Sequence, residues 1–221
     1  MVQSYIKIAI RLISRKKGYA GINILGLALG LATCILILLY VQDELSYDRF
    51  HSRAPDLYRI TADYVSETGT RNMARTAPLL GPTLEQEFPE IEHAVRFKTF
   101  GGILAWGDER HYESEGFFAV DESAFQAFSF DVLSGDASAL SAPFSVVLTK
   151  STARKYFGDV DPVGKTMTLR GTHPVTVTGV VADPPRNSHL QFGILMSFSS
   201  LETFYGADNL NTWMNNIYYT Y

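Results

Sequence analysis

The sequence has one cysteine, Cys34, among its 221 residues. A single cysteine excludes a disulfide within the chain, and it favours neither a reducing nor an oxidising compartment. Acidic residues are absent from the first 42 positions, and positions 19–42 hold no charge of either sign. These absences divide the chain into a basic beginning, an apolar run and a longer remainder that holds every acidic residue.

Charge is segregated along the chain, so the overall net charge of −4 is a poor description of it. Five basic residues precede Tyr19, and after Gln42 the chain has 23 acidic and 14 basic residues, a formal charge of −9. A net acidic region with scattered charges argues against a nucleic-acid partner.

The uncharged run over 19–42 predicts a transmembrane helix. At 1.5 Å per residue it spans roughly 35 Å, enough to cross about 30 Å of hydrocarbon with some tilt. A buried helix of a soluble protein rarely runs this long without a charge. A cleaved signal peptide has a shorter apolar core and a small-residue cleavage site, which the exit "LLYVQDE" does not offer.

Charges at the two ends of this run predict its orientation. Arg15, Lys16 and Lys17 precede it and Asp43 and Glu44 follow it, which places the N-terminus in the cytoplasm and residues 43–221 outside the inner membrane.

The first 18 residues combine apolar side chains with a basic stripe. Lys7, Arg11 and Arg15 recur at helical spacing. This pattern predicts a cytoplasmic interfacial amphipathic helix over 1–18, with an upstream extension of the membrane helix as the alternative.

Two small residues in the apolar run, Gly26 and Gly30, are four positions apart. A small-xxx-small face permits close approach of a second membrane helix, so these are the candidate helix-packing residues.

Residues 43–221 alternate strand and helix signals and predict a single α+β module, with a division into two lobes near residue 100 left open. Residues 57–65 read as a strand, and 78–88 as an amphipathic helix opened by Pro78. Further along, "FSVVLT", "KSTARKYF", "KTMTL" and "PVTVTGVVAD" predict strand, helix, strand and strand, with Gly158 ending the helix and a bulge at Gly179 as one option.

The triplet Gly164-Lys165-Thr166 raises the question of a nucleotide-binding loop. Five residues separate Gly158 from Gly164 where a P-loop has four, and the first-glycine position holds Asp159. Phosphate binding needs the order strand, loop, helix, whereas this segment reads helix, loop, strand. We therefore predict a turn.

The sequence shows no catalytic constellation. The five histidines never occur at metal-ligand spacing, no Gly-x-Ser-x-Gly elbow is present, and scattered carboxylates are typical of a solvated surface. We therefore predict no enzyme activity, no catalytic or metal-binding residue and no bound cofactor in this chain.

Two segments carry a family resemblance: "PFSVVLTKSTARKYFGDVDPVGKTMTL" and "VTVTGVVADPPRNSHLQF". Together with the N-terminal apolar run, "DELSYDRFH" and "LYRI", they resemble the start of MacB-like, FtsX-type ABC transporter permeases. The resemblance spans nearly the whole chain, and it makes 43–221 similar to a MacB-like periplasmic core domain that is incomplete at its C-terminus.

The resemblance implies a permease subunit with four transmembrane helices, of which this chain would be an N-terminal fragment. It implies a separate or fused cytoplasmic ABC ATPase that binds ATP, a second permease subunit, a periplasmic adaptor and membrane lipid as partners. The implied function is export, such as efflux, or signalling across the inner membrane. The alternatives are a single-pass receptor with an extracytoplasmic ligand-binding domain and, without a supporting constellation, a membrane-tethered hydrolase.

Overall fold

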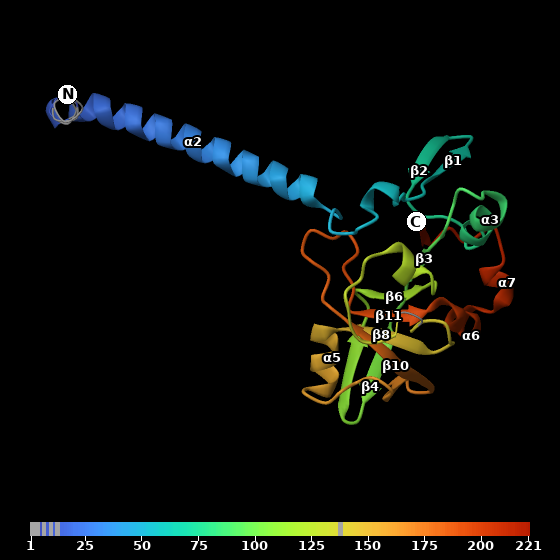
Figure 1. The fold of residues 1–221 in the computed structure, drawn as a ribbon. Helices are drawn as coiled ribbons and strands as arrows, with labels where there is room; N and C mark the ends of the chain where they lie inside the picture. The colour runs from blue at the N-terminus through green and yellow to red at the C-terminus, as the bar shows by residue number, and fades with distance from the viewer. Residues whose placement is uncertain (1–4, 6–7, 9–10, 12–13, 137–138) are drawn as a thin grey trace. The chain divides into compact units, whose positions relative to one another are not determined.

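A computed structural model describes residues 5, 8, 11, 14–136 and 139–221 (Figure 1). The chain divides into two compact units, residues 1–47 and 48–221. The interfacial helix predicted over 1–18 falls largely outside the described residues and stays a prediction.

The first unit contains one long helix, α2 (Lys17–Ser46), which includes the whole predicted membrane segment. It has no buried residue, and its apolar side chains are distributed around its entire circumference. Within the described part of the chain, it is the one helix long and apolar enough to cross a membrane. A helix that is apolar on all sides suits a lipid environment rather than the surface of a soluble domain.

The second unit is an α+β domain, as predicted. Its helices are short: α3 (Leu80–Glu87), α4 (Ala124–Ala127), α5 (Lys150–Phe157), α6 (Leu201–Tyr205), α7 (Ala207–Leu210) and the 3-10 turns η1 (Ala54–Asp56) and η2 (Phe198–Ser200). Its strands are β1 (Ala62–Ser66), β2 (Gly69–Met73), β3 (Arg96–Thr99), β4 (Gly102–Trp106), β5 (Glu109–Glu113), β6 (Phe117–Val120), β7 (Val132–Gly135), β8 (Ser145–Thr149), β9 (Thr166–Leu169), β10 (His173–Val181), β11 (Ile194–Ser197) and β12 (Tyr219–Thr220).

Strands β3 to β12 form a ten-stranded mixed sheet in the order β12-β3-β6-β11-β8-β10-β9-β4-β5, with β7 also paired to β10. The β8–β10 and β6–β11 pairs are parallel and the others antiparallel. β1 and β2 form a separate hairpin that extends from the domain (Figure 1). Because β3 and β4 belong to one sheet, residues near 100 do not separate two lobes.

The core lies on both faces of this sheet. Along β8, Val146 and Leu148 belong to one buried cluster and Val147 to the other, as the two-residue period of a strand requires. α5 packs on the first cluster through Ala153, Tyr156 and Phe157, and α4 on the second. A sheet covered on both faces explains why β8 and β11 are continuous apolar runs rather than alternating ones.

The predicted bulge at Gly179 is present as a register shift between Val177 and Gly179. Gly179 faces Gly135 of β7 across the strand pair. Gly135 has φ +92°, and a Cβ at this position would lie 2.3 Å from the Thr178 carbonyl oxygen. Only glycine permits β7 to approach β10 this closely.

The structure differs from two of the element predictions. The strand predicted over 57–65 begins only at Ala62, because residues 57–61 run as an extended segment with a single bridge from Ile60 to Thr220. The helix predicted over 78–88 begins at Leu80, so Pro78 precedes it. The Pro78 carbonyl accepts a hydrogen bond from the Arg96 side chain.

Candidate functional site

The Gly164-Lys165-Thr166 segment is a turn. It follows α5 and leads into β9, and Gly164 has φ +78°. The Lys165 backbone N–H donates to the Pro162 carbonyl, and Lys165 is exposed. No helix begins at this turn, so it lacks the helix N-terminus that binds phosphate in a P-loop.

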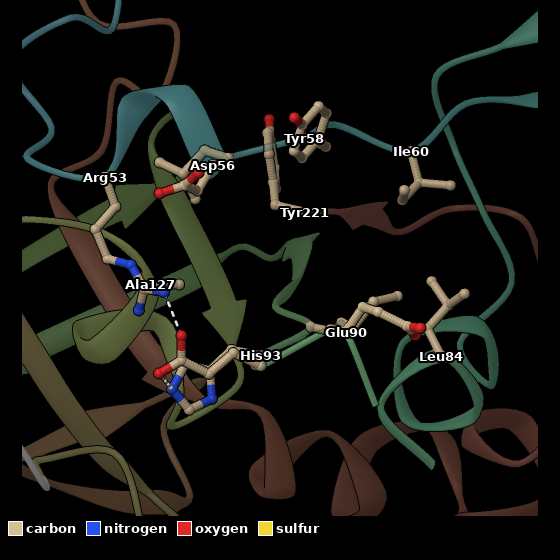
Figure 2. Close-up of a pocket in the computed structure, with 13 residues that line it drawn as sticks. Arg53, Asp56, Tyr58, Ile60, Leu84, Glu90, His93, Ala127 and Tyr221 are labelled. Atoms are coloured by element: carbon tan, nitrogen blue, oxygen red, sulfur yellow. Dashed lines mark hydrogen bonds and ion pairs between the residues drawn. The ribbon is translucent and has the colours of Figure 1, made fainter. Parts of the chain in front are cut away.

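A cavity of about 490 Å³ is the candidate functional site (Figure 2). Its apolar wall comes from side chains that are far apart in sequence: Leu57, Ile60, Leu84, Ile91 and Ala127. Its volume falls in the range typical of small-molecule sites, which are mostly apolar with a few polar groups.

Two aromatic rings also line this cavity, Tyr58 and Tyr221. Tyr58 is largely exposed, whereas Tyr221 is half-buried beside the second core cluster. Each ring offers an apolar face and a hydroxyl, a combination common at binding sites.

The polar residues of the cavity are mainly acidic: Asp56, Glu90 and Glu92. Arg53 forms an ion pair with Glu92, which is marked by a dashed line in Figure 2, and His93 lies 4.0 Å from the other oxygen of Glu92. Both members of the Arg53–Glu92 pair face solvent, so the pair contributes little to stability but neutralises one carboxylate.

Short-range contacts hold the cavity walls in place. The Arg96 side chain donates to both Asp121 carboxylate oxygens, at 2.8 and 2.7 Å, and to the Pro78 carbonyl at 2.7 Å. Glu85 of α3 accepts a hydrogen bond from the Ala94 backbone N–H. These contacts fix α3 and residues 90–94 to β3, and Arg96–Asp121 is a largely buried, bidentate pair of the strong kind.

A hydrogen-bonded chain leads from the cavity to the first residues of the domain. The Tyr221 hydroxyl lies 2.5 Å from Nε2 of His189, and Nδ1 of His189 lies 2.7 Å from the Asp48 carboxylate. Asp48 also accepts the His189 backbone N–H and donates its own to the Asn187 carbonyl. Burial raises the pKa of the Tyr221 hydroxyl to about 12, so it remains protonated at neutral pH.

His51 fixes the same segment from the other side. Its Nδ1 accepts the Ser129 backbone N–H at 3.1 Å, and its ring packs against Phe50, Phe128 and Phe130. Burial lowers the pKa of His51 more than the nearby Asp48 carboxylate raises it. The residues that follow α2 are therefore an ordered part of the domain from Asp48 onwards.

Comparisons with known proteins identify this fold. A family model described as the MacB-like periplasmic core domain matches residues 20–220. The chain belongs to this family.

Three solved structures are similar to this chain. A domain of a protein described as a permease, from Porphyromonas gingivalis, is 23% identical with a TM-score of 0.58, and the match covers 67% of this chain and 68% of that one. The periplasmic region of MacB from Actinobacillus actinomycetemcomitans is 19% identical (TM-score 0.45; 63% and 60% covered). The extracellular domain of the ABC-type transporter YknZ from Gram-positive bacteria is 21% identical (TM-score 0.44; 59% and 63% covered). No curated protein matches.

The two candidate helix-packing glycines of the MacB-like chain, Gly26 and Gly30, lie in α2. A Cβ at either position would have open space around it. Their role in packing against a partner helix stays a prediction.

The sequence did not single out the cavity or the Asp48–His189–Tyr221 chain of this MacB-like domain. Its members are separated by up to 173 positions and come from segments of different structure. The segments "DPPRNSHLQF" and "DELSYDRFH", which carried part of the family resemblance, contain His189 and Asp48, and these were the available signals. The described residues hold no group of three or more His, Cys, Asp or Glu side chains that could bind a metal ion.

Proposed function

We propose that this chain belongs to the permease subunit of an ABC-type transporter or mechanotransmission complex. In this role it couples a cytoplasmic ATPase to an extracytoplasmic domain for export or signalling across the inner membrane. The observation that carries the proposal is the family match over 20–220, which includes both most of the apolar helix and the α+β domain.

The proposed topology places the N-terminus in the cytoplasm and residues 43–221 in the periplasm. Support comes from Arg15, Lys16 and Lys17 before the apolar helix and Asp43 at its other end, since positive charge is retained in the cytoplasm. The proposed partners are lipid, the ATPase, a second permease subunit that packs at Gly26 and Gly30, and a periplasmic adaptor.

Coupling of this kind needs a firm connection between the membrane helix and the outer domain. Asp48 and His51 follow the end of α2 within five residues, and both are bonded to distant segments of the domain. Only Tyr47 lies between the end of α2 and Asp48, so the proposed coupling involves no long flexible linker. ATP would bind to the partner, and the proposal assigns neither a catalytic residue nor a cofactor to this chain.

The test uses the complete gene, co-expressed with its neighbouring ATPase and reconstituted in nanodiscs. In a Cys34→Ser background, Val65→Cys in the exposed β1–β2 hairpin carries an environment-sensitive fluorophore. ATP should change its emission, and Asp48→Ala combined with His189→Ala should reduce that change while ATP turnover continues. Asp161→Asn, an exposed carboxylate elsewhere in the domain, is the matched control. An emission that is indifferent to ATP would contradict the proposal.

The cavity favours one second candidate, a single-pass receptor whose outer domain binds a ligand. The sequence that follows residue 221 in the gene distinguishes the two. Three more apolar spans support the permease, and a kinase or methyl-acceptor-type helix supports the receptor.

A further inference from the structure

The cavity beside α3 combines an apolar wall with a net negative charge among its lining residues. Arg53 is the cation among the described lining residues, and it is paired with Glu92. The Asp56 and Glu90 carboxylates are exposed, and no ion pair in the described part of the chain holds either of them.

We propose that this cavity binds a small cationic amphiphile. The apolar body of the ligand would contact Leu57, Ile60, Leu84 and Ile91, and its ammonium group would lie near Asp56 and Glu90. This inference rests on the proposed function, because it supplies the class of ligand that the coupled domain would sense.

Three electrostatic interactions favour a cation at this site. The two carboxylates attract it directly, and the exposed Tyr58 ring can add a cation–π contact. The surrounding region, residues 43–221, has a formal charge of −9, which raises the local concentration of cations. An anionic head group would instead meet two carboxylates and an arginine whose charge is already compensated by Glu92.

A chain of hydrogen bonds connects the cavity to the residues that follow the membrane helix. Tyr221 is a wall of the cavity, and its hydroxyl is bonded to His189, which is bonded to Asp48. Asp48 is the second residue after α2. A ligand that displaces the Tyr221 ring would therefore alter contacts at the point where the chain leaves the helix.

The experiment is isothermal titration of the full chain in nanodiscs, with empty nanodiscs as the blank. The probes are phenylbutylammonium, phenylbutyrate and phenylbutanol, which share one apolar body and differ in head-group charge. At low salt we expect the ammonium probe to bind roughly ten-fold or more tightly than the carboxylate probe, with the alcohol between them. The preference should shrink as salt screens the charges.

Substitutions in the cavity test whether the probes bind there. Asp56→Asn with Glu90→Gln keeps the shape of the site and should abolish the preference for ammonium while the alcohol binds as before. Glu87→Gln, an α3 carboxylate outside the cavity, should change nothing. Ile91→Trp should fill the cavity and abolish binding of all three probes, with thermal unfolding confirming that each variant is folded.

Equal affinity for the three probes, an absence of binding, or a preference that survives the double variant would each overturn the inference. The result of the probe titration can be distinguished from the result of the test of the proposed function. An ATP-dependent change at Val65→Cys without probe binding refutes the ligand class alone, and probe binding without that change refutes the coupling alone.

Discussion

The apolar helix and the α+β domain solve the problem of apolar surface in opposite ways. α2 has 30 residues and buries none of them, whereas the domain places its apolar side chains in two clusters on the two faces of a ten-stranded sheet. The domain supplies its own apolar environment, whereas an apolar helix of this kind needs one from outside, such as lipid. Each region should therefore respond differently to the same kind of substitution.

The largest expected effect is the loss of the protein from the membrane when a charge is placed in the middle of the helix. Leu31→Arg places a guanidinium near the centre of 19–42, at a cost of about 2.5–3.5 kcal/mol for insertion. We expect most of the protein to be lost from the carbonate-resistant membrane fraction. Leu45→Arg, near the end of α2, is the control and should remain inserted because its side chain can reach the interface. Equal retention of both variants would contradict a membrane-spanning α2.

Within the domain, the largest expected effect on stability is that of a cavity in the core. Leu148 is fully buried, and Leu148→Ala should lower the free energy of unfolding of the domain by about 3–5 kcal/mol. Val65→Ala, in the exposed hairpin, should change it by less than about 0.5 kcal/mol. Denaturation of the full chain in nanodiscs, followed by near-UV circular dichroism, measures both. Similar losses for the two variants would contradict the burial of Leu148 in the sheet core.

A smaller effect is expected where β7 meets β10. Gly135→Ala combines a positive φ with a clash against the Thr178 carbonyl and should cost about 2–4 kcal/mol. Gly107 also has a positive φ, but a Cβ there has open space, so Gly107→Ala should cost only about 1–2 kcal/mol. The same unfolding assay measures the loss of stability in both variants. A larger loss for Gly107→Ala than for Gly135→Ala would refute the close approach of these strands.

The smallest effect is a pH dependence. The pKa of His51 is lowered in the folded domain because the ring is buried, so the unfolded chain takes up a proton more readily. Stability should therefore fall as pH drops through about 6.5, the ordinary pKa of histidine. His51→Asn should show a flatter profile between pH 8 and 5.5 than the unmodified protein. Parallel profiles would contradict a buried neutral His51.

Sequence reasoning succeeded where the signal is local. The apolar run over 19–42, the helix "KSTARKYF" with Gly158 at its end, and the bulge at Gly179 each depend on neighbouring residues, and the structure shows all three elements. Strand order was not predictable in this way. The parallel pairing of β6 with β11, for example, joins segments more than 70 residues apart.

The candidate site is harder to predict than the fold for the same reason. Tyr221, His189 and Asp48 are ordinary surface-type residues until the fold brings them together. The carboxylates of Asp56 and Glu90 are likewise typical of a solvated surface in the sequence, and only the fold shows that they border a cavity. Scattered surface charge in the sequence thus gives no indication of a cavity that depends on tertiary structure.

The most direct test of the account is the location of the two regions across the membrane. In a Cys34→Ser background, Val65→Cys and Ser14→Cys are exposed to a membrane-impermeant maleimide in sealed spheroplasts of cells that express the full chain. The account predicts rapid labelling of Val65→Cys in intact spheroplasts and labelling of Ser14→Cys only after permeabilisation. Labelling of Ser14→Cys in intact spheroplasts, or protection of Val65→Cys until they are opened, would contradict it.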